Sequence, residues 1–405
     1  MKNFKNYLTI SLSMVLLVFL SSCSSDDDGD SPIGPEPTGE TKTYALGAVS
    51  NPDISGSATI SEFDDGSITL TIQLENTPDG GMHPAHIHFN TAAEGGDIAV
   101  SLTPVDGATG TSVTNFTALD DGTTLSYDEL LEFDGYINVH LSAEDLATLV
   151  AQGDIGQNEL TGTTKVYDLG SVDVPDISGT ATFSERVNGE ALAVIELENT
   201  PDGGMHPGHI HVNTAAEGGG IAFTFTPVNG TTGISKTNVA ELDDETAFGY
   251  NEVLSFDGYI NIHLSMDDLA TLVAQGDIGQ NELTGTTKVY DLGSVDVPDI
   301  SGTATFSERV NGEALAVIEL QNTPDGGMHP GHIHMNSAAE GGPIAFTFTP
   351  VNGTTGISKT NVAQLDDMTA FGYSEVLTYD GYINIHFSAD DLATLVAQGD
   401  IGSNE

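Results

Sequence analysis

The sequence predicts an all-β protein of three tandem domains, each a β-sandwich or barrel with one short helix. Three observations lead to this prediction. A unit of 123 residues recurs three times along the chain. Within each unit, short segments alternate between apolar and polar residues, and turn residues separate them. One further segment in each unit has its apolar residues at helical spacing.

The repeats set the domain boundaries. Residues 160–282 and 283–405 align without a gap and differ at only twelve positions, and residues 41–159 are a more divergent copy in the same register. The sequence T-K-x-Y-x-L-G opens every copy. A period of about 120 residues is the size of an independent domain and too long for a solenoid unit. We therefore predict repeat domains at 41–160, 161–283 and 284–405.

The elements of one unit are best described in the first copy. Alternating segments on either side of Asp65-Gly66 predict a hairpin, and the later copies carry Asn-Gly at this turn, the favoured two-residue pair. The predicted strands cover 57–63, 67–74, 86–90, 98–102, 111–118 and 136–141. A helix is predicted next, with Ser142 as its N-cap, Leu146, Leu149 and Val150 as its apolar stripe, and Gly153 as its end.

The residues before the repeats predict a lipoprotein leader. A short basic start precedes an apolar segment, Tyr7 to Leu20, that is too short to span a bilayer comfortably. It ends in Leu-Ser-Ser-Cys, which resembles the lipobox of bacterial lipoproteins. Cys23, the only cysteine, is therefore the expected site of lipidation by palmitate. We expect a signal peptide at 1–22 and an acidic disordered linker at 23–40.

The acidic run after Cys23 bears on where the chain is displayed. It resembles the surface-export signal of lipoproteins in the Bacteroidetes group, and the alternative is a plain solvated linker. We expect the protein to be held by its lipid in the outer membrane and exposed at the cell surface.

The composition is strongly acidic, with 60 acidic and 9 basic residues and a formal net charge of −51. Such a field repels phosphate backbones, so nucleic acid is excluded as a partner. It favours cations. Solubility in a salty exterior is an alternative reason for the same charge, and charge alone does not separate the two.

All twelve histidines fall into one pattern, which occurs once in each repeat. H-P-(A/G)-H-I-H is followed 52 residues later by N-(V/I)-H. The three sets are His83, His86, His88 and His140; His206, His209, His211 and His263; and His329, His332, His334 and His386. Four histidines per repeat with none elsewhere indicate three copies of one site.

Strand geometry indicates which of these histidines converge. Residues two apart in a strand project from the same face, so His86 and His88 lie side by side, as do Asn138 and His140. If the two strands are neighbours, three imidazoles meet, a set that suits Zn(II) or Cu(II) better than calcium or magnesium. The predicted metal ligands are His86, His88, His140, His209, His211, His263, His332, His334 and His386. His83, His206 and His329 have the opposite parity and are predicted to support the site. The alternative is that the histidines are structural and are satisfied by backbone groups.

The segments G-G-M-H-P-(A/G)-H-I-H and G-Y-I-N-(V/I)-H resemble the CHRD domain, named after chordin, and the likeness covers residues 41–405 three times over. The resemblance implies an immunoglobulin-like β-barrel distantly similar to Cu/Zn superoxide dismutase. It also implies copper ligands at His86, His88 and His140, with His83 as supporter. The departures are the absence of any histidine between His88 and His140, which removes the bridging ligand and the zinc subsite, and the absence of an arginine after the last histidine.

The functional prediction is a non-catalytic, surface-anchored lipoprotein in which each domain binds copper or zinc. One alternative is an adhesion module in which structural histidines brace the fold and loops bind an extracellular protein or glycan. Another is a copper-dependent enzyme similar to superoxide dismutase. The anionic surface disfavours that enzyme because it would repel superoxide.

Overall fold

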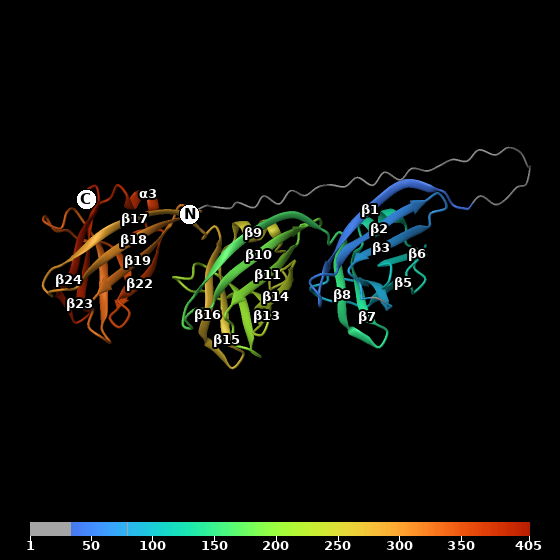
Figure 1. Cartoon of the computed structure of the whole chain (residues 1–405). Helices are drawn as coiled ribbons and strands as arrows, with labels where there is room; N and C mark the ends of the chain where they lie inside the picture. The colour runs from blue at the N-terminus through green and yellow to red at the C-terminus, as the bar shows by residue number, and fades with distance from the viewer. Residues whose placement is uncertain (1–33, 79) are drawn as a thin grey trace, which may run out of the picture.

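The computed structural model describes residues 34–78 and 80–405. Nearly all of this part is β-structure, folded into three closed antiparallel barrels of eight strands with one short helix each. The barrels stand side by side in chain order (Figure 1). The predicted fold class is confirmed. In this part of the chain, no helix is both long enough and apolar enough to cross a membrane.

The first barrel defines the topology. Its elements are β1 (Pro37–Ala48), β2 (Ser55–Phe63), β3 (Ile68–Glu75), β4 (Met82–Phe89), β5 (Ile98–Asp106), β6 (Thr111–Phe116), α1 (Tyr127–Leu131), β7 (Asp134–Ser142) and β8 (Asp145–Gly156). Around the barrel the order is β1-β2-β3-β6-β5-β4-β7-β8, and β8 closes it by pairing with β1. The strand β4 therefore lies between β5 and β7.

The other two barrels repeat this order. The second contains β9 (Leu160–Ser171), β10 (Ser178–Arg186), β11 (Ala191–Glu198), β12 (Met205–Val212), β13 (Ile221–Asn229), β14 (Ile234–Val239), α2 (Tyr250–Ser255), β15 (Asp257–Ser265) and β16 (Asp268–Gly279). The third contains β17 (Leu283–Ser294), β18 (Ser301–Arg309), β19 (Ala314–Gln321), β20 (Met328–Met335), β21 (Ile344–Asn352), β22 (Ile357–Val362), α3 (Tyr373–Val376), β23 (Asp380–Ser388) and β24 (Asp391–Gly402).

Each barrel has its own apolar core, built by strand alternation. In β3, Ile68, Leu70 and Ile72 are fully buried, while the residues between them face outward. All six strands predicted from this pattern are present in the first barrel. The alternation also decides which side chains of the site strands point away from the core.

The helix lies elsewhere than the sequence predicted. Residues 145–156 form the strand β8, and the helix is α1, which begins after a capping box formed by Ser126 and Glu129. Ser142 does accept backbone N–H groups, as a cap would, but they are those of Glu144 and Asp145 in the tight turn between β7 and β8. Pairing with β7 and β1 closes the barrel and outweighs the helical spacing of the leucines.

The N-terminal predictions meet the structure only in part. β1 begins at Pro37, so residues 37–40, predicted to be disordered linker, belong to the first barrel. The predicted signal peptide at 1–22, the lipidation site Cys23 and the run after it lie outside the described residues.

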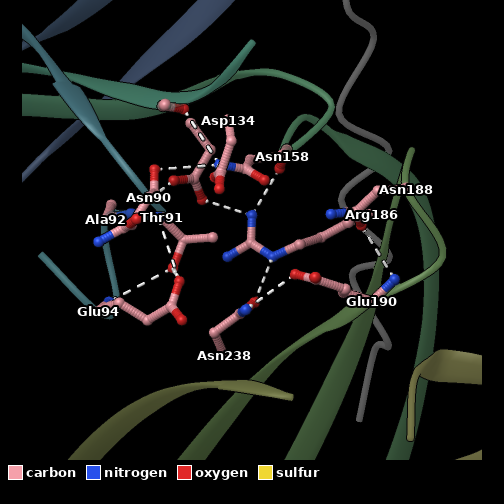
Figure 2. Close-up of polar contacts among 12 residues, drawn as sticks. Asn90, Thr91, Ala92, Glu94, Asp134, Asn158, Arg186, Asn188, Glu190 and Asn238 are labelled. Carbon is pink, nitrogen blue, oxygen red and sulfur yellow. Dashed lines mark hydrogen bonds and ion pairs between the residues drawn. The ribbon is translucent and has the colours of Figure 1, made fainter. Parts of the chain in front are cut away.

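A buried arginine joins the first two barrels. Arg186, at the end of β10, has a side chain that is 0% exposed, and its Nη1 donates to Asp154 Oδ2 at 2.8 Å and to the carbonyl oxygen of Asn158 at 2.5 Å, both in the first repeat. Its Nε donates to Asn238 of its own barrel at 2.9 Å. Figure 2 shows the guanidinium enclosed by side chains of both barrels. Asp154 is fixed in turn, because it accepts the backbone N–H of Ala92.

The junction between the second and third barrels is built the same way. Arg309 pairs with Asp277 at 2.8 Å and donates to the carbonyl oxygen of Asn281. These are the only two arginines in the sequence, and the matching residue of the first repeat is Phe63. Both arginines of the chain therefore serve to join barrels.

We predict that Arg186→Ala destabilises the first junction by about 3–5 kcal/mol, because it leaves the largely buried carboxylate of Asp154, whose side chain is 11% exposed, without its partner. Urea unfolding of the whole chain, followed by circular dichroism, measures the loss. The matched control is Lys165→Ala, which removes a half-exposed ion pair with Glu282 and should cost under about 1 kcal/mol. Equal losses for the two variants would contradict the role given to Arg186.

Candidate metal centre

The pairing of β4 with β7 brings the predicted ligands together. The two strands run antiparallel, with His86 opposite Asn138 and His88 opposite Tyr136, so His140 lies one diagonal step from His86. Each barrel holds one such triad: His86, His88 and His140; His209, His211 and His263; His332, His334 and His386. In each triad one nitrogen per ring lies within 4.8 Å of the other two. The predicted convergence of three imidazoles is thus observed in all three barrels.

The triad sits on the outer face of the barrel wall. Ala85 and Ile87, between and beside the two histidines of β4, are 0% exposed and belong to the apolar core. His86 and His88 point the opposite way, as strand alternation requires. His88 and His140 are nevertheless buried, at 9% and 7% exposure, while His86 is only partly buried. The site is therefore a sheltered patch that remains reachable from solvent at His86.

Two backbone carbonyls determine the tautomer of two rings. His88 Nδ1 donates to the carbonyl oxygen of Gly96 at 2.9 Å, and His140 Nδ1 donates to that of Leu146 at 2.7 Å. The same pair of bonds recurs in the second and third barrels. Because the proton is held on Nδ1, each Nε2 presents a lone pair to the centre of the triad.

His86 presents its other nitrogen. Its Nδ1 lies 3.2 Å from His140 Nε2. Metal–nitrogen bonds of about 2.0–2.1 Å in a tetrahedral site place two ligand nitrogens about 3.3 Å apart. The observed pair already has this spacing. The candidate ligand set of the first barrel is thus one Nδ1 and two Nε2 atoms.

Several buried nitrogens of the triads lack hydrogen-bond partners among the described residues. They include Nε2 of His88, His211, His263, His334 and His386, and Nδ1 of His209 and His332. Leaving a buried polar atom unpaired costs about 1–3 kcal/mol. Several such atoms facing one another fit a bound cation, and three imidazoles form a donor set that suits a transition metal.

An aromatic ring and an amide pair support the triad, and neither was predicted. Tyr136 stacks on His88 with ring centroids 5.0 Å apart and an interplanar angle of 17°. Asn138, opposite His86, accepts a hydrogen bond from Gln152 Nε2 at 2.9 Å. The sequence did place Tyr136 two residues before Asn138, but only the register shows that its ring covers His88.

One carboxylate acts on the exposed side of the triad. Asp120 accepts hydrogen bonds from the backbone N–H and hydroxyl of Ser101, and these bonds hold the pKa of Asp120 below its usual range. The charge of Asp120 favours the protonated form of His86. A negative charge at this place also favours a metal cation.

Burial favours the neutral form of two rings in each triad. It lowers the pKa of His86 and of His140, and the neighbouring imidazoles lower the pKa of His86 further. The corresponding rings of the other barrels shift in the same direction. Neutral imidazole is the form that binds metal.

The fourth histidine of each set stands apart from the triad. His83 is 1% exposed on the core side of β4, and its Nδ1 donates to the carbonyl oxygen of Leu141, next to His140, at 2.8 Å. His206 makes the same bond to Leu264. In the third barrel the matching residue is Phe387, and His329 instead packs against its ring with centroids 6.3 Å apart. These histidines thus brace the strand that carries the third ligand.

Comparisons with protein-family models, with curated proteins and with solved structures gave no match for this chain. The fold and the site define a class by themselves: three tandem β-barrels, each with a histidine triad that could hold a metal ion.

We predict that the metal-free protein loses stability as the pH falls from about 7 towards 5. The pKa values of His86, His140 and their counterparts are lower in the fold than the usual value of about 6.5, so the unfolded chain binds more protons in this window. Their contribution is complete above about pH 6.5 and is lost on acidification. Thermal unfolding in the presence of a chelator measures it. Replacing the six histidines by glutamine should flatten the dependence, and an unchanged slope would contradict this assignment.

Proposed function

We propose that this protein is a metal-binding protein that holds one copper or zinc ion on each barrel. The observation that carries the proposal is the preset ligand set: one Nδ1 and two Nε2 atoms within 4.8 Å, two of them with a tautomer fixed by backbone carbonyls. Recurrence in three barrels supports it, because a chance arrangement of structural histidines has no reason to keep the same carbonyl partners each time.

The chemistry of the donors favours copper. Three imidazole nitrogens without thiolate bind divalent metals in the order that peaks at Cu(II), ahead of Zn(II). A three-ligand set leaves a coordination position for water or a fourth group. The net charge of −51 raises the local concentration of cations around all three sites.

Storage or buffering of metal fits the site better than catalysis on superoxide. Asp120 is the carboxylate that acts on His86, and its negative charge would repel an anionic substrate. Three sites in one chain multiply capacity. The CHRD resemblance, which implies the same ligand positions, supports a metal-binding role without the dismutase function.

The location proposed for the protein follows from its leader. A lipid on Cys23 would anchor the chain in the outer membrane, and the acidic segment after it would favour display at the cell surface. Metal capture outside the cell is the role consistent with that location.

The metal proposal predicts a stoichiometry. The chain from residue 24 on, reconstituted with Cu(II) and desalted, should retain about three ions, one for each three-histidine site. His86→Ala/His88→Ala should remove one of them, and the same double change in β12 or β20 should remove another. Elemental analysis counts the ions, and electron paramagnetic resonance of the copper form should show coupling to several nitrogens.

The matched control is Thr69→Ala/Thr71→Ala, a pair two residues apart on β3 that also projects away from the core. It should leave all three ions in place. Retention of less than one copper or zinc ion per wild-type chain would sink the metal proposal, and protein or glycan binding by the loops would become the leading function.

The proposed lipid anchor on Cys23 makes a separate prediction. Wild-type protein expressed with its leader should partition into the detergent phase and incorporate labelled palmitate, because the lipid adds a large apolar surface. Cys23→Ser should shift the protein to the aqueous phase, and Ser24→Ala should not. Membrane retention of the Cys23→Ser protein would contradict lipid anchoring without affecting the metal proposal.

A further inference from the structure

A cavity of about 410 Å³ lies where the first and second barrels meet. Its walls come from both barrels: Ala45 and Gln152 belong to the first, and Leu192 and Lys236 to the second. The size is that of a pocket for a small organic molecule. No residue of a histidine triad lines it, although Gln152, which donates to Asn138 beside the triad, belongs to its wall.

Among the charged side chains that line the cavity, the two carboxylates have ion-pair partners and the one lysine has none among the described residues. Two carboxylates line it, but Asp154 is neutralised by Arg186 and Glu159 by Lys42, which lies 2.5 Å away. Lys236, also in the wall, makes no ion pair within the described ranges 34–78 and 80–405. The cavity wall therefore includes one lysine without an ion-pair partner in this part of the chain, at an exposed position of β14, and its ammonium group would attract an anion.

The rest of the wall is mixed. Leu160 and Leu192 offer apolar surface, and the small side chains of Ala45 and Ala92 leave the volume open. Gln152 supplies the polar edge of the first barrel, and its Nε2 is occupied by Asn138. A ligand that fits has one anionic group and a short apolar body.

The cavity at the second junction differs from that at the first in size and in charge. The cavity there is smaller, about 280 Å³, and Asp168 occupies the position of Ala45. Its other carboxylates, Asp277 and Glu282, are paired with Arg309 and Lys165. Asp168 has no such partner in the described residues, so this cavity has an uncompensated negative charge where the first has a positive one.

We propose that the cavity between the first two barrels binds a small organic monocarboxylate, with its carboxylate on Lys236 and its apolar body against Leu160 and Leu192. Arg186 contributes indirectly, because its contacts with Asp154 and Asn158 hold the two walls at a fixed separation. The second junction does not take this ligand, because Asp168 repels it. The chain thus has one such site, independent of metal.

The test uses the metal-free whole chain with benzoate and hexanoate as probes. Saturation-transfer NMR should detect both, and calorimetric titration at millimolar probe should give one site per chain. The neutral amides of the same acids should bind at least about tenfold more weakly, because they lack the charge-assisted hydrogen bond.

Single changes locate the site. Lys236→Gln, on an exposed position of β14, should weaken benzoate binding about tenfold or more. Lys359→Gln, the same change in the third barrel, should leave it unaltered. Ala45→Asp copies the second repeat and should abolish binding.

Three results would overturn the proposal: no binding of either acid, equal binding of acid and amide, or binding that survives both Lys236→Gln and Ala45→Asp. Because the chain is metal-free throughout, none of these results depends on whether the histidine triads bind copper.

Discussion

The antiparallel pairing of β4 with β7 is the constraint on which the metal centre depends. Its register sets His86 opposite Asn138 and His88 opposite Tyr136, which places His140 within reach of both ligands on β4. A slip of one residue would turn His86 and His88 into the core and Ala85 and Ile87 outward. The apolar core therefore holds the site in place, since any other register would expose fully buried side chains.

Backbone carbonyls orient two of the histidines that the strand register brings together. The loop after β4 and the start of β8 each bring one carbonyl oxygen to a triad histidine, and these carbonyls decide which nitrogen carries the proton. Tyr136 then covers one face of His88. Two of the three rings are thus oriented by backbone carbonyls and not by a carboxylate. The surrounding acidic protein would balance the charge of a cation bound there.

The alternation of apolar and polar residues was enough to predict most strands and the convergence of the triad, because the direction of side chains in a strand follows from local geometry alone. It failed at β8. There Leu146, Leu149 and Val150 satisfy a helical spacing as well as a strand, and only the pairing with β1 and β7, distant in sequence, decides between them. The carbonyl partners and the role of Arg186 were out of reach for the same reason, since both are contacts between distant segments.

Differences among the repeats distinguish the residues that form the histidine triad from those that join neighbouring barrels. The triad and its carbonyl partners recur in every copy, whereas Phe63, Ala45 and Val113 in the first barrel correspond to Arg186, Asp168 and Lys236 in the second. Arg186 and Lys236 act at the first junction and Asp168 at the second. A buried arginine is costly to desolvate unless it has partners, and here the preceding barrel supplies Asp154 and the Asn158 carbonyl. The histidine triad is thus a property of each barrel, while the junctions depend on the order of the barrels in the chain.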